Sequence, residues 1–358
     1  MSAGINSALA ARIGALLARP GPDITPAEGL HLVADLRNQA GKAFGYVAEI
    51  TGLTGAAEDA SATEMLVVDR RGLVRGVVGA IQSLAASLWE HDELPWAARQ
   101  VASAQVGALT GFLAYRMLGQ YDPFHVSPDG QTGRILLAAP NVLRFERELD
   151  ADPRDFHLWV ALHEVTHAVQ FAAAPWLPGW IKGRLAALAQ AQPEPGGPGE
   201  LLAAFKHLPD LFAEEVRPQL ATPLLSPDQS RVLADLAATM SLLEGHSDVI
   251  MDAVGPKLVK TVEQLRPKFD ARRVAQGRFE RALRRMAGIE AKTAQYVQGA
   301  AFVRASLAEL GHEGFNAVFA SPQALPSAAE LDNPRAWTTR LTGNASFEGR
   351  PSSSQDER

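Results

Sequence analysis

The sequence predicts a mainly α-helical protein with one small β-sheet or hairpin. Alanine and leucine are abundant along the 358 residues, and apolar positions recur every three or four residues. This is the period of a helix that covers a core. A short apolar run at 134–139 lies between turn-forming residues instead, as a strand does. The length suits one large domain or two moderate ones.

The helical pattern divides the chain into three parts. We expect a helical N-terminal region at 1–119, a second region at 120–341 and a disordered tail at 342–358, which is polar, serine-rich and without periodicity. Proline and glycine at 192–200 predict a linker loop. The expected helices are 5–18, 26–48, 64–90, 97–119, 153–173, 200–218, 227–254, 257–270, 276–286 and 288–310.

The expected strand is Arg134–Ala139. It follows the turn-rich sequence SPDGQTG and ends before Pro140 and Asn141. The segment Phe124–Val126 can pair with it to form the hairpin or small sheet.

Charge and composition narrow the possible partners and compartment. The formal net charge is −6 and no basic stripe is present, so we expect neither nucleic acid nor an anionic membrane surface as a partner. The chain contains no cysteine, which fits a reducing cytoplasm. The N-terminal segment lacks the basic start of a signal peptide, and the least polar stretch, 101–118, is too short and too polar to span a bilayer. We therefore expect a cytoplasmic protein.

The sequence HEVTH at 163–167 is the main chemical signal. It lies in a helix that Asp152 can cap and Pro153 can begin. A spacing of four places His163 and His167 one turn apart on one face, where both can bind one zinc ion. Glu164 can then take a proton from a zinc-bound water and deliver it to a leaving group. Two ordinary helical histidines are the alternative interpretation.

A third ligand is expected from the sequence LEGHSD at 243–248. Glu244 and Asp248 are four residues apart and share a helical face, so Glu244 can bind the metal while Asp248 accepts the second N–H of a ligand histidine. His246 is the alternative third ligand; otherwise it can stabilise an oxyanion. Gly245 suggests a close approach to the metal helix.

These motifs resemble the gluzincin branch of the zincin metallopeptidases. HEVTHAV is similar to the active-site helix of thermolysin-like enzymes, and Glu244-x-x-x-Asp248 matches their third-ligand helix. The resemblance implies that His163, His167 and Glu244 bind zinc, that Glu164 is the base and that Asp248 orients a ligand histidine. The β-rich N-terminal domain and the calcium loops of thermolysin have no counterpart in the sequence.

A longer part of the chain, from about 120 to 337, resembles a zincin-like hydrolase family whose label associates it with deazaflavin-coenzyme biosynthesis. We infer no deazaflavin site from this label. The similar segments are RILLAAPNV, DFHLWVALHEVTHAVQFAAAPWL, LLEGHSDVIMD, KTAQYVQGAAFV and SPQALPSAAELDNPRAW.

Substrate contacts are expected at two places. In zincins a strand ahead of the metal helix commonly pairs with an extended peptide, which assigns substrate binding to Arg134, Leu136 and Ala138; a purely structural hairpin is the alternative. Tyr296 can polarise a carbonyl with its phenol, or it can simply pack with its hydroxyl at the rim.

The resulting hypothesis is a zinc metallopeptidase or amide hydrolase with a zincin-like core in the region 120–341. Its zinc-bound water, activated by Glu164, attacks a peptide or amide carbonyl. One alternative is a non-catalytic zincin scaffold with a structural metal or a partner-binding cleft. The other is a helical interaction protein without a metal.

Overall fold

The computed structural model describes residues 5–88, 95–190, 227–269 and 299–348. These residues form many helices and one three-stranded sheet, so the expected mainly helical fold with a small sheet is confirmed. In the described part of the chain, no helix combines the length and the apolar character needed to cross a membrane.

The elements follow in chain order. They are α1 (Ser7–Leu17), α2 (Pro26–Thr51), α3 (Thr54–Ala60), β1 (Glu64–Val68), α4 (Arg70–Leu88), α5 (Trp96–Leu113), β2 (Gly119–Val126), β3 (Thr132–Ala138), α6 (Ala139–Leu149), α7 (Pro153–Ala173), α8 (Leu177–Gln190), α10 (Pro227–Ala253), α11 (Gly255–Leu258), α13 (Gly299–Phe315), the short 3₁₀ helices η4 (Asn316–Phe319) and η5 (Pro322–Ala324), α14 (Ala328–Asp332) and α15 (Pro334–Glu348). Residues 262–269 are also helical.

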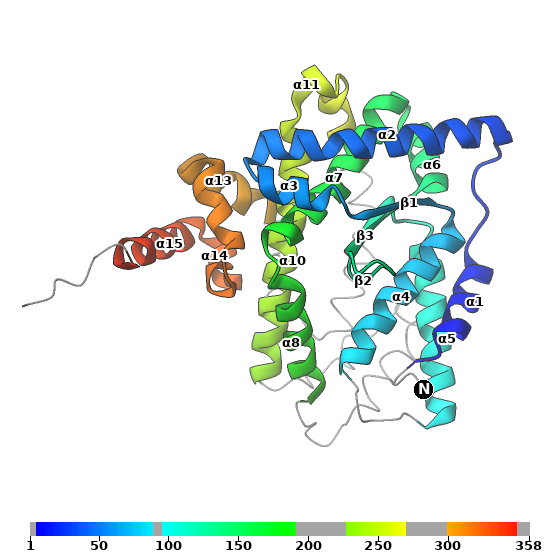
Figure 1. Cartoon of the computed structure of the whole chain (residues 1–358), viewed down its shortest axis with the longest axis horizontal. Coiled ribbons are helices and arrows are strands. Elements are labelled where there is room, and N and C mark those ends of the chain that lie inside the picture. Colours follow the sequence, from blue (N-terminus) through cyan, green and yellow to red (C-terminus); the bar gives the residue numbers. More distant parts are fainter. Residues whose placement is uncertain (1–4, 89–94, 191–226, 270–298, 349–358) are drawn as a thin grey trace, which may run out of the picture.

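The sheet has the order β1-β3-β2, with β1 parallel and β2 antiparallel to the central strand β3. Alternate β3 residues point to opposite faces, as in any strand. Ile135 and Leu137 join the core cluster that contains α7, whereas Leu136 and Ala138 pack with Leu73 and other residues of α4. The sheet thus lies between α7 and α4 (Figure 1).

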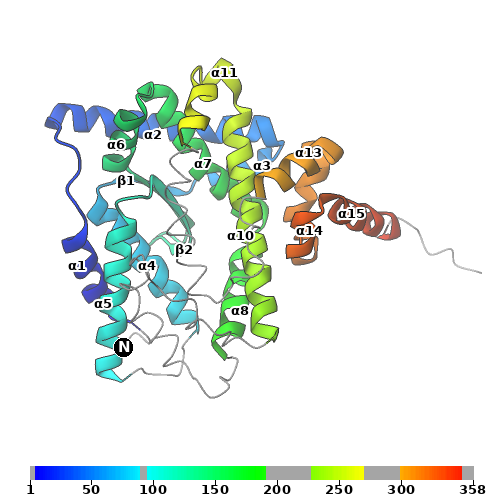
Figure 2. The ribbon, with the colours of Figure 1, turned by 180° about the vertical axis from the view of Figure 1, so that it is seen from behind.

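Helix α7 occupies the middle of the main core. Its N-cap Asp152 accepts a hydrogen bond from Asp155 N, and Pro153 is the first helical residue, as expected from the sequence. Phe156, Trp159 and Leu162 are fully buried. Helices α2, α3 and α10 pack around α7, and the long helix α10 passes close to α7 in both views (Figures 1 and 2). The HEVTH motif at 163–167 is therefore held on a helix that is buried along most of its length.

Two expected helices are shorter because strands adjoin them. The helix expected at 64–90 begins at Arg70, since 64–68 form β1, and the helix expected at 97–119 ends at Leu113, ahead of β2. β1 pairs with β3, which follows it by some seventy residues, and no local pattern reveals such a partner.

The C-terminal half departs from the expectation in two places. The helix expected at 257–270 is divided into α11 and 262–269. Helix α13 is broken by the non-helical backbone of Gly311, so its first part ends where the helix expected at 288–310 ends. Helix α15 extends to Glu348, so residues 342–348 are helical where a disordered tail was expected. The expected helices 200–218 and 276–286, the linker 192–200 and Tyr296 lie outside the described residues.

Candidate metal centre

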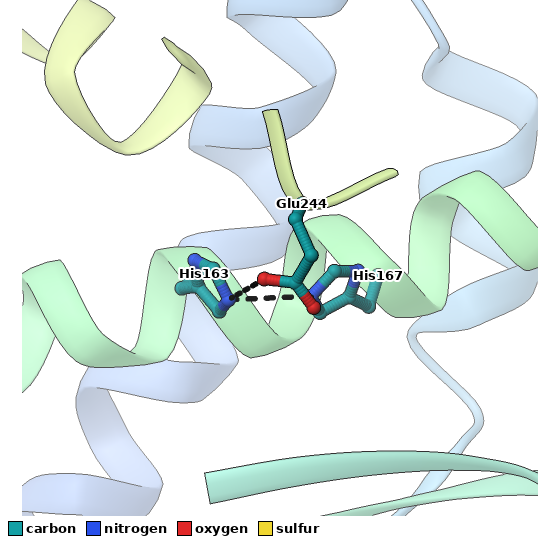
Figure 3. Close-up of side chains that lie close together, drawn as sticks. All are labelled: His163, His167 and Glu244. Carbon is teal, nitrogen blue, oxygen red and sulfur yellow. Dashed lines mark hydrogen bonds and ion pairs between the residues drawn. The ribbon is translucent and has the colours of Figure 1, made fainter. Parts of the chain in front are cut away.

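Two histidines from α7 and one carboxylate from α10 converge at one point (Figure 3). Glu244 places one carboxylate oxygen 3.4 Å from His163 Nε2 and the other 3.6 Å from His167 Nε2. The two Nε2 atoms are 3.2 Å apart. Ligand atoms that share a tetrahedral zinc at 2.0–2.2 Å are separated by about 3.3–3.6 Å. One ligand atom from each of the three residues lies within 4.8 Å of the other two, so this group could hold a single zinc ion.

The carboxylates around His163 favour a positive charge at this position, either a proton on the ring or a bound metal ion. Burial lowers the pKa of His163, but Glu244, Glu164 and Asp248 outweigh this effect and raise the pKa to about 9. Without a metal, a proton on His163 therefore balances part of the carboxylate charge, and a bound divalent ion would displace that proton. The Glu244 side chain is 44% exposed, so the site has a side open to solvent.

Asp248 lies one helical turn after Glu244, as expected. Its carboxylate is 3.8 Å from His163 Nδ1, on the side of the ring away from Glu244. Arg266, from the helical segment 262–269, is 3.6 Å from the same carboxylate and donates a hydrogen bond to the Asp248 carbonyl. Arg266 thus holds Asp248 in place, and this residue was not among those expected from the sequence.

Glu164 is buried beside the two histidines, and burial raises its pKa to about 7. The first residue of β2, Gly119, makes room for it, because a Cβ atom at this position would be 2.7 Å from Glu164 Cγ. A carboxyl group with a pKa near neutrality can both accept and release a proton in water. The geometry is suited to the base role expected from the motif.

His246 does not join the ligand group. Its Nδ1 contacts Gln170 Nε2 at 3.0 Å, and its ring stacks on Phe315 with the centroids 5.2 Å apart. Burial, followed by the nearby His312 and His167, lowers the pKa of His246 to about 3. Two positions along a helix correspond to about 200°, so His246 points away from the face that carries Glu244. The alternative of His246 as third ligand is therefore wrong, whereas its role as an oxyanion donor stays a prediction.

The substrate contacts expected on β3 are also wrong. β3 is the central strand and pairs on both edges, so it has no free edge for a peptide. Leu136 and Ala138 are buried in the cluster with α4, on the face opposite to α7. Arg134 forms an ion pair with buried Asp122. Sequence alone does not tell a central strand from an edge strand when one of the partners is remote.

Gln170 is a second residue of the site that sequence analysis missed. Its Oε1 lies 2.9 Å from His167 Nδ1, and its Nε2 donates to the carbonyl of Leu243. A ligand histidine almost always has a hydrogen-bond partner for its second ring nitrogen. Gln170 follows His167 by three residues on α7, and this spacing could have identified it as that partner.

Comparison with known proteins assigns the chain to a family. The model of the zincin-like metallopeptidases matches residues 5–338. The chain belongs to this family. Membership implies a divalent metal, typically zinc. Among the described residues of this family member, His163, His167 and Glu244 are the one group that could hold it.

A solved structure supports the same fold. A crystal structure from Chloroflexus aurantiacus, described as a candidate hydrolase with a novel fold, is 26% identical, with a TM-score of 0.65. The match covers 94% of this zincin-like chain and 99% of the other. A search of curated proteins finds no significant match.

Proposed function

We propose that this protein is a zinc-dependent hydrolase and, more specifically, a metallopeptidase that cleaves a peptide or amide bond. The observation that carries the proposal is the position of Glu164, a buried carboxyl group next to a His–His–Glu set that fits zinc. A structural zinc site needs four protein ligands and no base. Three ligands, a solvent-facing side and an adjacent carboxylate favour catalysis.

The chain supplies the groups that such a reaction needs. Zinc bound by His163, His167 and Glu244 would act as a Lewis acid that polarises a carbonyl and makes water more acidic. The Glu164 carboxylate would accept a proton from water and deliver it to the departing amine. Asp248 and Arg266 would hold His163 in place throughout. The hydrolase description of the structurally similar protein from Chloroflexus aurantiacus supports the reaction class.

We infer that β2, and not β3, is the strand that holds the substrate. β2 is an edge strand of the described sheet, and its first residue, Gly119, lies against Glu164. An extended peptide can add to such an edge through main-chain hydrogen bonds. This pairing would bring the peptide backbone next to the proposed base.

The test is digestion of a proteome-derived peptide library by the zinc-loaded full-length protein and by its Glu164→Gln variant. We expect the wild type to cut peptides and the variant to lose at least about 10²-fold in rate, because general base catalysis is removed. Glu49→Gln, an exposed carboxylate on α2, is the matched control and should cut like the wild type.

Cleavage by Glu164→Gln at the wild-type rate would contradict the assigned base. No cleavage by either zinc-loaded protein would contradict the peptidase proposal and favour a non-catalytic zincin scaffold. Zinc content and the melting temperature of each variant, measured alongside, show whether a lost activity reflects chemistry or folding.

A further inference from the structure

Gln170 connects a proposed zinc ligand to the neighbouring helix. Its side chain is fully buried between α7 and α10. On α7 its Oε1 meets His167 Nδ1 at 2.9 Å, and on the α10 side its Nε2 meets Leu243 O at 2.9 Å and His246 Nδ1 at 3.0 Å. The amide therefore links His167 to His246.

The partners on α10 determine which way the amide points. A backbone carbonyl can only accept hydrogen bonds, so the group facing Leu243 O must be the NH₂ end of the amide. A flipped amide would place Oε1 against Leu243 O, so that two acceptors would face each other and this buried hydrogen bond would be lost. His246 Nδ1 fits the observed orientation as an acceptor from the same NH₂ group. The oxygen of Gln170 therefore faces His167.

An amide oxygen facing His167 selects one form of the imidazole. Because Oε1 can only accept, Nδ1 of His167 must carry the proton. The lone pair of the neutral ring is then on Nε2, the atom that faces Glu244 and His163. We propose that Gln170, oriented by Leu243 and His246, is the positioning residue that holds His167 in its metal-binding tautomer. This inference rests on the proposed zinc site.

The two ligand histidines would thus be oriented by different chemistry. Asp248, supported by Arg266, faces Nδ1 of His163 with a carboxylate, whereas a neutral amide faces Nδ1 of His167. Ser247 Oγ, 3.3 Å from the same nitrogen, can rotate its hydroxyl to suit either form of the ring and so selects neither. The assignment depends on the amide alone.

A purely structural role for Gln170 makes a different prediction. If the residue only fastened α7 to α10, zinc affinity would depend on the hydrogen bonds that its NH₂ group donates to α10. It would not depend on the contact between its oxygen and His167. Gln170→Met removes both functions in a side chain of similar shape. Gln170→Glu keeps an acceptor for His167 but loses the donors to Leu243 and His246. The pair of variants separates the two roles.

The experiment measures the zinc dissociation constant of the full-length protein by chelator competition, together with the visible spectrum of the cobalt-substituted form. For Gln170→Met we expect zinc affinity to fall by about 10–100-fold, which is typical when the hydrogen-bond partner of a ligand histidine is lost, with an altered cobalt spectrum. Gln170→Glu should bind zinc much more tightly than Gln170→Met. Gln39→Leu, at a buried glutamine on α2, is the control and should bind like the wild type.

Wild-type affinity in Gln170→Met, or equal weakening in both Gln170 variants, would overturn the inference while leaving the zinc site intact. A wild type that binds no zinc would instead overturn the proposed function. One measurement needs no variant: nitrogen NMR of histidine-labelled, zinc-loaded wild type should show His167 with a protonated Nδ1 and a metal-bound Nε2. The reverse pattern would also overturn the inference.

Discussion

The position of Glu164 depends on a residue without a side chain. Gly119 begins β2, and a Cβ atom there would meet the Cγ, Cδ and Oε1 atoms of Glu164 at 2.7–2.8 Å. Real Cβ contacts are not this short, so any larger residue must displace the Glu164 carboxyl group. The sheet thereby fixes how closely the proposed base approaches the ligand histidines.

We expect Gly119→Ala to slow hydrolysis strongly while leaving zinc bound. The displaced atoms belong to a flexible side chain, so the carboxyl group can move away, and a misplacement of about 1 Å can cost about 10²-fold in rate. The decrease should appear in kcat more than in KM. Steady-state kinetics on a peptide found in the library digest, with zinc content measured in parallel, provide the test. An unchanged kcat would show that Glu164 does not depend on this contact.

Helices α10 and α13 cross with their backbones in contact. A Cβ atom on Gly245 would lie 2.2 Å from the carbonyl carbon of Gly299, and one on Gly299 would lie 2.0 Å from Ser241 O. The close approach of Gly245 to α7 that the sequence suggests is therefore wrong, because the close neighbour of Gly245 is α13. The crossing fixes α10 at the residue that follows Glu244.

Gly245→Ala should destabilise the protein by about 1–3 kcal/mol, the usual cost of overpacking, because neither backbone can yield as a side chain would. The matched control is Gly45→Ala on α2, where nothing lies within 4 Å of the added Cβ; it should stabilise by about 1 kcal/mol through helix propensity. Urea unfolding of both variants measures the difference. If both changes had the same effect, the crossing would not require glycine.

The sequence predicted those elements whose signals are local. The cap at Asp152, Pro153 and the apolar pattern give α7 its observed start and end, and the four-residue spacings gave His163, His167, Glu244 and Asp248. Periodicity could not separate the short apolar run 64–68 from the helix that follows it. Other features depend on segments that meet only after folding, so local patterns could not predict them. These features are the place of each strand in the sheet, the direction of the His246 side chain and the hydrogen bond between Gln170 and His167.

At the scale of the whole molecule, His157 joins three helices. This buried residue of α7 contacts Asp35 of α2 through Nδ1 at 2.6 Å and Glu146 of α6 through Nε2 at 2.8 Å. Burial lowers the pKa of His157, but the hydrogen bonds to Glu146 and Asp35 outweigh it and the net shift is upward. The charged imidazole thus links the first long helix to the helix that carries the metal motif.

An upward pKa shift in the folded state means that the folded protein binds this proton more tightly than the unfolded chain does. Its stabilising effect is complete below the unfolded pKa of about 6.5 and is lost as pH rises through the folded pKa. His157→Gln should therefore be less stable than the wild type by about 1–3 kcal/mol near pH 6, and the difference should shrink as the pH rises above the unfolded pKa. Urea unfolding of both proteins at a series of pH values from about 6 upward is the test. A difference that grows with pH would contradict the stabilising role of the protonated His157.

The central claim is that His163, His167 and Glu244 bind one zinc ion. The most direct measurement is elemental analysis of the full-length protein purified without chelator or added zinc, for the wild type and for Glu244→Ala. We predict about one zinc per chain in the wild type, consistent with a single three-ligand site, and a large loss in Glu244→Ala. Wild-type protein without zinc, or Glu244→Ala with unchanged zinc content, would contradict the account.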